Sequence, residues 1–344
     1  MKNILVTGGC GFIGSNFIRN IIDKDIFIFN LDKLTYAGNP ENLTDIEGRK
    51  EYKPLYKKDI CDSDYVARVM DEYKIDTIVN FAAESHVDRS ILGPEIFTTT
   101  NVLGTQKLLD VSKNYWTSLP EGYKGKRFLQ ISTDEVYGSL PKTGKFKETT
   151  PLSPNSPYSA SKAAADMMVR AYFHTFGYPS IISRCSNNYG PYQFPEKLIP
   201  LMIWKAMNDQ RLPIYGDGLN VRDWLHVNDH CSAIETILKK GKNGEVYNIG
   251  GNNEWPNIKV AKRILLELGK PEDLIMMVKD RPGHDRRYAM DAGKIRRELK
   301  WKPKYTFEKG LKDTIRWYLG HKDWLKNVIN QEYLSYYDKN YNSK

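Results

Sequence analysis

The sequence lacks the features that mark several large protein classes. It contains no run of about 20 apolar residues, the length that a helix needs to cross a bilayer. It has no internal repeat, and its four cysteines, Cys10, Cys61, Cys185 and Cys231, lie far apart without a Cys-x-x-Cys pair. That spacing disfavours a zinc site or a disulfide framework and is typical of reduced thiols. We therefore expect a globular, cytoplasmic protein with no bound metal and no membrane partner.

Basic residues are in excess, and the formal net charge is +9 over 344 residues. Such an excess is compatible with nucleic-acid binding. The Lys and Arg residues are scattered, however, and mostly interleaved with Asp and Glu, as at residues 57–59. This pattern indicates a solvated surface, so we expect no nucleic-acid partner. A local positive site for an anionic small molecule remains compatible with the composition.

Short apolar runs alternate with helical patterns in the first half of the chain. The expected strands are residues 3–7, 26–31, 77–82 and 127–132, and the expected helices after the first one are 63–73, 101–113 and 160–171. This alternation predicts an α/β fold with a Rossmann-type, doubly wound parallel sheet. After about residue 190, Pro and Gly recur and the alternation becomes irregular. We expect a first domain over 1–189 and a smaller C-terminal lobe over 190–344, from which segments could return to the first domain.

A Gly-rich segment joins the first expected strand to the first expected helix. Gly8, Gly11 and Gly14 form a Gly-x-x-Gly-x-x-Gly motif. Such a turn brings backbone N–H groups to a pyrophosphate at the positive end of a helix, and a Cβ would block that approach. Asp32 ends the second strand, 18 residues after Gly14, where a carboxylate can hold ribose hydroxyls and repel a 2′-phosphate. The sequence therefore predicts NAD rather than NADP.

Tyr158 and Lys162 stand four residues apart at the start of an Ala-rich helix, so their side chains share one helix face. A nearby ammonium, and the positive nicotinamide of NAD⁺, would lower the pKa of the phenol. The phenolate could then take a proton from a substrate hydroxyl. Tyr-x-x-x-Lys also occurs at Tyr305 and Tyr318, where we expect surface pairs on an amphipathic stretch.

Residues 130–138 read Gln-Ile-Ser-Thr-Asp-Glu-Val-Tyr-Gly, so Thr133, Asp134 and Glu135 follow an expected strand. A strand end with a solvated turn would explain this motif by itself. Beside a nicotinamide signature, it indicates more: hydride transfer needs one base, whereas an acid and a second base imply that a group such as water is also removed. Adjacent carboxylates in a closed site push their pKa values apart, so one can be the acid and one the base.

These motifs stand in one order along nearly the whole chain. They are residues 8–14, 32–39 (Asp-Lys-Leu-Thr-Tyr-Ala-Gly-Asn), 82–90 (Ala-Ala-Glu-Ser-His-Val-Asp-Arg-Ser), 132–138, 156–162, 187–200, 222–227 (Arg-Asp-Trp-Leu-His-Val) and 280–288 (Asp-Arg-Pro-Gly-His-Asp-Arg-Arg-Tyr). Together they resemble the dTDP-glucose 4,6-dehydratase family, within the nucleotide-sugar dehydratases and epimerases of the extended short-chain dehydrogenase/reductase superfamily. The segments 133–135 and 280–288 are the most specific. A short, Lys-rich connection over 139–149 departs from the family pattern.

The resemblance implies a catalytic set and two sets of ligand contacts. The catalytic residues would be Thr133, Asp134, Glu135, Tyr158 and Lys162. The NAD contacts would be Gly8, Gly11, Phe12, Ile13, Gly14, Asp32, Lys33, Leu34, Thr35, Asp59, Ile60, Ala82, Ala83, Glu84, Ser85, Thr100, Tyr158, Lys162 and Asn188. The contacts to the substrate, dTDP-glucose, would be Ser85, Thr133, Asn187, Lys197, Leu198, Pro213, Ile214, Tyr215, Arg222, Asn257, Arg281, His284 and Tyr341. The first domain would thus bind NAD, the C-terminal lobe would bind the sugar nucleotide, and the protein would be a homodimer.

Within the substrate set, the resemblance implies particular roles. Lys197 and Arg222 would neutralise the diphosphate, which a guanidinium fork suits. Pro213 to Tyr215 would offer an aromatic face to the thymine. Each of two residues has an alternative to ligand binding: Tyr215 as a core residue at a strand end, and His284 as an exposed loop residue.

The implied reaction is a dehydration with internal hydride return. Tyr158 would deprotonate the C4 hydroxyl while hydride passes to NAD, and Thr133 would hold the C4 oxygen. Glu135 would then remove the C5 proton, Asp134 would protonate the departing C6 hydroxyl, and hydride would return to C6. The alternatives are a dehydratase for another nucleotide, an epimerase, or a non-catalytic dinucleotide-binding protein. The paired carboxylates disfavour an epimerase, and an intact Tyr-x-x-x-Lys pair disfavours a non-catalytic protein.

Overall fold

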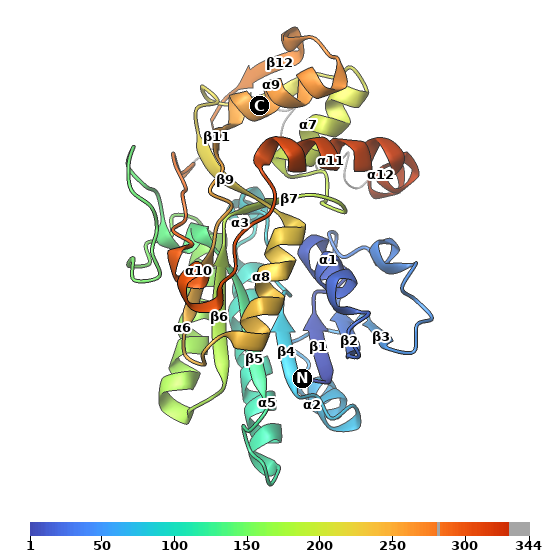
Figure 1. Cartoon of the computed structure of the whole chain (residues 1–344), viewed down its shortest axis with the longest axis vertical. Coiled ribbons are helices and arrows are strands. Elements are labelled where there is room, and N and C mark those ends of the chain that lie inside the picture. Colours follow the sequence, from blue (N-terminus) through green and yellow to red (C-terminus); the bar gives the residue numbers. More distant parts are fainter. Residues whose placement is uncertain (281–282, 330–344) are drawn as a thin grey trace.

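The computed structural model describes residues 1–280 and 283–329, and its architecture is α/β (Figure 1). The largest element is a parallel sheet with the strand order β10-β6-β5-β4-β1-β2-β3. Its strands are β1 (Asn3–Thr7), β2 (Phe27–Asp32), β3 (Tyr52–Tyr56), β4 (Thr77–Asn80), β5 (Arg127–Thr133), β6 (Ser180–Cys185) and β10 (Val246–Ile249). The Rossmann-type sheet that the sequence predicts is therefore confirmed.

Alternating residues of β1 divide the core into two layers, because successive strand side chains point to opposite faces. Ile4 and Val6 pack with α1 (Phe12–Ile21), α8 (Val227–Lys240) and α10 (Gly293–Leu299). Leu5 packs with the helices of the other face, which are α2 (Ser63–Glu72), α5 (Thr105–Ser118) and α6 (Pro157–Phe176). Both faces of the sheet are thus covered, which explains why most residues of its central strands are buried.

The strand order reverses between β1 and β4. β1 pairs with β2 on one side and with β4 on the other, so consecutive crossovers leave the centre of the sheet in opposite directions. In such sheets a crevice opens at the carboxyl ends of the strands at the reversal point. Thr7, Asp32 and Thr133 lie at these strand ends.

A second core lies beyond the carboxyl ends of the parallel strands, in the upper part of Figure 1. Its helices are α7 (Leu198–Met207), α9 (Asn257–Leu268), α11 (Phe307–Gly320) and α12 (Lys322–Val328). They pack with two small sheets, ordered β11-β9-β7 and β12-β8. The strands are β7 (Asn187–Tyr189), β8 (Leu212–Tyr215), β9 (Val221–His226), β11 (Glu254–Pro256) and β12 (Ile275–Val278). The remaining short elements are η1 (Pro40–Leu43), α3 (Val87–Leu92), α4 (Glu95–Phe97), η2 (Thr98–Gly104), η3 (Asp134–Tyr137) and η4 (Glu272–Leu274).

Several segments after residue 190 return to the first sheet, one as a strand and two as covering helices. β10 pairs with β6, and α8 and α10 cover the same face as α1. A domain boundary at residue 189 stays a prediction. Among the described helices, none combines the length and apolar character that a bilayer span requires.

Two local expectations differ from the structure. The helix expected over 101–113 begins earlier, as a π-helix over Thr98–Gly104 that continues into α5. The expectation of a surface pair at Tyr318 is wrong, because this side chain is fully buried and its hydroxyl donates to the Gln193 carbonyl over 2.7 Å. The periodicity of α11 places Tyr318 on the apolar face of that helix, where it joins the second core.

Candidate active site

A cavity of about 430 Å³ lies at the carboxyl ends of the parallel strands, between the sheet and the second core. Most of the residues that the sequence predicts as ligand contacts line this cavity. Two of the described residues do not line it: Leu34, and Ile214, which is buried in the second core. Arg281 and Tyr341 fall outside the described residues. None of the described lining residues comes from the Lys-rich connection 139–149.

The Gly-rich turn has the shape that a dinucleotide needs. Gly8 has a φ of +69°, and a Cβ there would lie 2.7 Å from the Ala82 nitrogen. A Cβ on Gly14 would lie 2.4 Å from the Gly8 carbonyl oxygen. Helix α1 starts directly after this turn, and its N-cap residue, Gly11, makes no side-chain capping bond. The first N–H groups of α1 are therefore free of side-chain caps, as binding of an NAD pyrophosphate requires.

Asp32 lies at the cavity end of β2 and is almost completely buried. Its two carboxylate oxygens accept hydrogen bonds from the backbone N–H groups of Cys10 and Leu34, each at 2.8 Å. Burial raises the pKa of Asp32, and these two donors act in the opposite direction. The carboxylate thus braces the Gly-rich turn and also faces the cavity, where an adenosine ribose would fit.

The Thr-Asp-Glu turn begins at the last residue of β5. The Thr133 hydroxyl accepts from the Glu135 N–H and donates to Asp134 Oδ1, both at 3.2 Å. Asp134 is 1 % exposed, and its Oδ2 atom has no hydrogen-bond partner among the described residues. Burial raises the pKa of Asp134 well above its usual range, and the negative charges of Glu135 and Asp223 add to this effect. The environment of Asp134 therefore favours its neutral, acid form and leaves one carboxyl oxygen available.

Tyr158 and Lys162 lie near the start of α6, which a Ser156–Ser159 capping box and Pro157 initiate. Burial raises the pKa of Tyr158 well above its usual range, and a hydrogen bond with Thr133 acts in the opposite direction. The fold alone therefore raises this pKa, and the expected lowering by Lys162 and NAD⁺ together stays a prediction. The Lys162 ammonium donates to the Ile131 carbonyl over 2.7 Å, and burial lowers its own pKa. The positive charge of bound NAD⁺ would oppose the effect of burial on the phenol.

The two cations expected to bind the diphosphate, Lys197 and Arg222, lie in the chain after residue 190. Arg222 is 5 % exposed, its guanidinium lies 4.3 Å from the Tyr288 ring centroid, and it donates to the Asp285 carbonyl over 3.0 Å. Lys197 donates to the Ser85 carbonyl over 2.9 Å. The two cations therefore border the cavity from different segments, as a diphosphate clamp requires.

The end of the cavity at Tyr215 has an aromatic wall. The Tyr215 and His284 rings meet edge to face with their centroids 5.9 Å apart. The Tyr215 hydroxyl donates to the Asp88 carboxylate over 3.4 Å. Asn187 and Asn257 each have a buried side-chain oxygen without a hydrogen-bond partner in the described part of the chain. Unpaired buried amide oxygens at a cavity favour a polar ligand there.

Glu196 and His86 are among the cavity residues that were not expected as ligand contacts. Glu196 accepts a hydrogen bond from the Tyr36 hydroxyl over 3.0 Å, and its carboxylate lies 3.7 Å from His86 Nε2. Burial raises the pKa of Glu196 to about 7. The signal in the sequence was their position in the motifs 82–90 and 187–200, which does not reveal burial. Elsewhere in the described ranges, no cluster of His, Cys, Asp or Glu side chains has the arrangement of a metal site.

The cavity at the sheet reversal, the Gly-rich turn and the Tyr158–Lys162 face define a nucleotide-dependent enzyme of the short-chain dehydrogenase/reductase type. The family model described as GDP-mannose 4,6 dehydratase matches residues 5–314. The dTDP-glucose 4,6-dehydratase of Xanthomonas campestris pv. campestris strain B100 is 54 % identical to this chain, with 97 % of each chain covered. That of Salmonella typhimurium is 50 % identical, with 99 % of each covered. The chain belongs to the dTDP-glucose 4,6-dehydratase family.

Solved structures agree with this assignment. A dTDP-glucose 4,6-dehydratase from Bacillus anthracis in complex with NAD is 51 % identical, with a TM-score of 0.87 over 95 % of this chain and 100 % of that one. A Streptomyces venezuelae dehydratase with NAD bound is 45 % identical, with a TM-score of 0.89 over 95 % and 99 % of the two chains. A UDP-glucose 4-epimerase from Thermotoga maritima shares the fold at 28 % identity and a TM-score of 0.84, covering 92 % and 99 %.

Proposed function

We propose that this protein uses NAD to dehydrate dTDP-glucose to dTDP-4-keto-6-deoxy-glucose. The observation that carries the proposal is the turn at 133–135, where the buried Asp134, whose pKa is raised by burial, precedes Glu135 at a cavity that also contains Tyr158. A simple dehydrogenase needs only the Tyr-x-x-x-Lys pair. The 50–54 % identity to dTDP-glucose 4,6-dehydratases over almost the full chain supports the same substrate.

The first half-reaction is oxidation at C4 of the glucose. When bound, NAD accepts the hydride from C4 and returns it to C6 at the end. Tyr158 takes the proton of the C4 hydroxyl, and Thr133 donates a hydrogen bond to the same oxygen. The Lys162 ammonium lies on the same face of α6 as Tyr158. Its positive charge favours the phenolate that accepts the proton of the C4 hydroxyl. The resulting ketone makes the neighbouring C5 proton acidic.

The second half-reaction is elimination of water across C5 and C6. Glu135 takes the C5 proton, and Asp134 gives its proton to the departing C6 hydroxyl. The buried Oδ2 atom of Asp134, which has no partner among the described residues, supports this donor role. Because the ionised acid would sit beside Glu135 in a buried site, its charge is unfavourable once the proton has left, and this favours its reprotonation before the next turnover.

Transfer of an isotope label tests the whole mechanism. Substrate deuterated at C4 should give product deuterated at C6, with no crossover into unlabelled molecules mixed with it. The C5 position should carry a solvent proton, since Glu135 can exchange with water before reprotonation. An epimerase would return the label to C4, and a simple dehydrogenase would release it on free cofactor. Label found anywhere but C6 would refute the proposed reaction.

We also propose that the protein is a cytoplasmic homodimer. Exposed apolar side chains gather on helices that contact one another, namely Leu92 on α3, Ile96 on α4, Leu103 in η2 and Met167 on α6. A second copy of the chain would bury this face, as dimer interfaces do. Sedimentation of Leu92→Lys should then show a monomer where the parent protein sediments as a dimer. A parent protein that sediments as a monomer would exclude the homodimer.

A further inference from the structure

A buried ion pair lies behind the catalytic turn, and the reaction described above does not use it. Arg184 on β6 donates from Nε to Asp166 Oδ2 on α6 over 2.8 Å. The two side chains are 4 % and 0 % exposed. Neither residue lines the cavity. Removing two charges from water is costly, and the mutual attraction only partly compensates, so such a pair is weak evidence for a purely stabilising role.

The first arm of this network reaches the residue before the catalytic turn. The Ser132 hydroxyl donates to the same Asp166 oxygen over 3.0 Å. Ser132 directly precedes Thr133, and both belong to β5. A side chain of α6 therefore fixes the position of the β5 residue that precedes the Thr-Asp-Glu turn.

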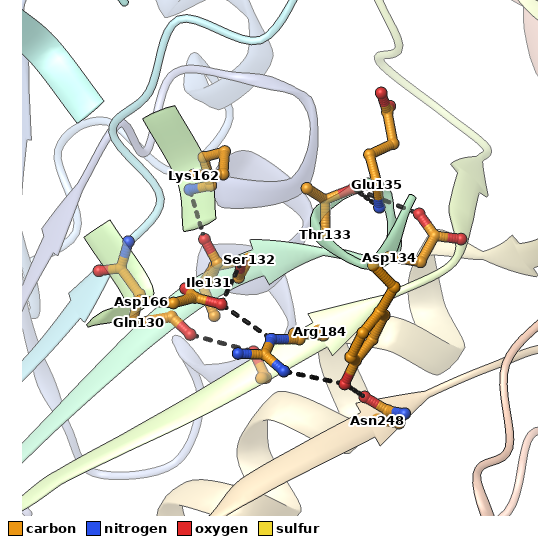
Figure 2. A network of polar contacts seen from close by, with 12 residues as sticks. Gln130, Ile131, Ser132, Thr133, Asp134, Glu135, Lys162, Asp166, Arg184 and Asn248 are labelled. Carbon is orange, nitrogen blue, oxygen red and sulfur yellow. Dashed lines mark hydrogen bonds and ion pairs between the residues drawn. The ribbon is translucent and has the colours of Figure 1, made fainter. Parts of the chain in front are cut away.

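The second arm reaches the end of the turn. Arg184 donates from its NH1 nitrogen to the Tyr137 hydroxyl over 2.9 Å. Tyr137 is the last residue of η3, and its hydroxyl in turn donates to Asn248 Oδ1 on β10 over 2.8 Å. In Figure 2 the carboxylates of Asp134 and Glu135 extend from the turn, away from Arg184. One ion pair thus holds both ends of the segment that carries the acid and the base.

The same ion pair is attached to the helix of the first base. Asp166 follows Lys162 and Tyr158 at intervals of four residues, so all three share one face of α6. The charge of Asp166 favours the ammonium of Lys162, against the effect of burial on its pKa. The network therefore connects the group that acts at C4 with the groups that act at C5 and C6.

We propose that Asp166, Arg184 and Tyr137 are positioning residues, which hold Asp134 and Glu135 in a fixed register against Tyr158. This inference rests on the proposed function. Both half-reactions act on neighbouring carbons of one bound sugar, so the two sets of groups must be placed correctly at the same time. A misplacement of about 1 Å in such a site can cost roughly a hundredfold in rate.

The test compares two Tyr→Phe variants that each delete one buried hydroxyl. Tyr137→Phe opens the network, whereas Tyr178→Phe breaks a hydrogen bond with Ser112 in the core layer of α5, away from the cavity. Both variants should lose similar thermal stability. Only Tyr137→Phe should lower kcat, by roughly tenfold or more, at unchanged KM for dTDP-glucose and unchanged NAD binding. The deuterium isotope effect on kcat from label at C5 should also rise, because elimination becomes slower.

A second pair of variants keeps the proposal testable if Tyr137→Phe folds poorly. Ser132→Ala opens the other arm, and Ser112→Ala is its control. Ser132→Ala should also lower kcat, and the double variant Ser132→Ala/Tyr137→Phe should lose less than the product of the single effects, because both act through one ion pair. Turnover equal to that of the controls would overturn the positioning role. Failure of the unmodified protein to dehydrate dTDP-glucose would instead refute the proposed function, so the two failures are distinguishable.

Discussion

Replacing the acid with its amide should make the protein less active and more stable. Asp134 is buried and its pKa is raised well above the usual range, chiefly by burial, which favours the protonated form in the folded protein. In the unfolded chain the same carboxyl ionises above about pH 4. Folding at neutral pH must therefore take up a proton. Asn has a similar shape and does not titrate. Asp134→Asn should therefore lose elimination activity, and its folding should not include the free-energy cost of protonating a carboxyl at neutral pH.

The size of the effect follows from proton linkage. A raised pKa in the fold means that the contribution of this carboxyl to stability is fully present below its unfolded pKa. It is lost as pH rises from there to the folded pKa, at about 1.4 kcal/mol per pH unit. The stability advantage of Asp134→Asn over the parent protein should therefore grow by about 1.4 kcal/mol for each pH unit in this window.

Asp223→Asn serves as a comparison variant, which also removes a charge that raises the pKa of Asp134. Burial raises the pKa of Asp223 from 3.8 to about 6. The free energy of unfolding of Asp223→Asn, relative to the parent protein, should therefore stop increasing near pH 6. The difference should then be about 3 kcal/mol, which is about two pH units at 1.4 kcal/mol each. The amide oxygen can still accept the Asn253 N–H that bonds Asp223 Oδ1 at 2.7 Å.

The measurement is urea unfolding of the parent protein and both variants at a series of pH values. For Asp134→Asn, the stability difference should rise with pH and continue past the pH at which Asp223→Asn levels off. A difference that does not change between pH 5 and 8 would mean that Asp134 is ionised in the fold. In that case it cannot donate a proton to the C6 hydroxyl, whatever the activity of the variant.

Three further substitutions test separate parts of the site. Glu135→Gln should permit oxidation at C4 and block elimination, so reduced cofactor should accumulate on the enzyme, whereas Tyr158→Phe should accumulate none; normal turnover of Glu135→Gln would exclude it as the base. Asp32→Ala should relax the preference for NAD over NADP, and an unchanged ratio of the two affinities would refute its ribose contact. Arg222→Ala should weaken substrate binding by roughly 2–5 kcal/mol, a factor of about 30 to 4,000, with NAD binding retained. Equal loss of both ligands would indicate instead that Arg222 mainly holds the Asp285 backbone, whose carbonyl it contacts at 3.0 Å.

Local patterns in the sequence were enough to predict most of the first sheet. The strand expected over 127–132 is β5 (Arg127–Thr133), and the helix expected over 63–73 is α2 (Ser63–Glu72). β6 and β10 were not among the expected strands. Neither was β3 (Tyr52–Tyr56), which is short and contains Pro54. Its place at the edge of the sheet explains why proline is tolerated there.

The chemistry of the site could also be predicted from local motifs, but its support could not. Asp134 and Glu135 stand in one short motif, and so do Tyr158 and Lys162. The Arg184–Tyr137–Asn248 connections join residues that are 47 and 111 positions apart. No periodicity encodes such contacts, since they depend on which strands become neighbours. Burial also raises the pKa of Tyr158 in the fold alone, an effect that sequence reasoning did not include because it counted the nearby charge but not the loss of solvent.

The return of β10 to the first sheet has a consequence for how the protein is made. β10 completes the sheet beside β6, and Trp301 joins the core layer of α1 and α8. A ribosome must therefore have synthesised about 300 residues before the cofactor-binding half can close its own core, although its Gly-rich turn is made first. Until then β6 presents an open edge, where strands from other chains can pair. A fragment that ends at residue 189 should accordingly aggregate when expressed alone. Nascent chains of that length would therefore need chaperones.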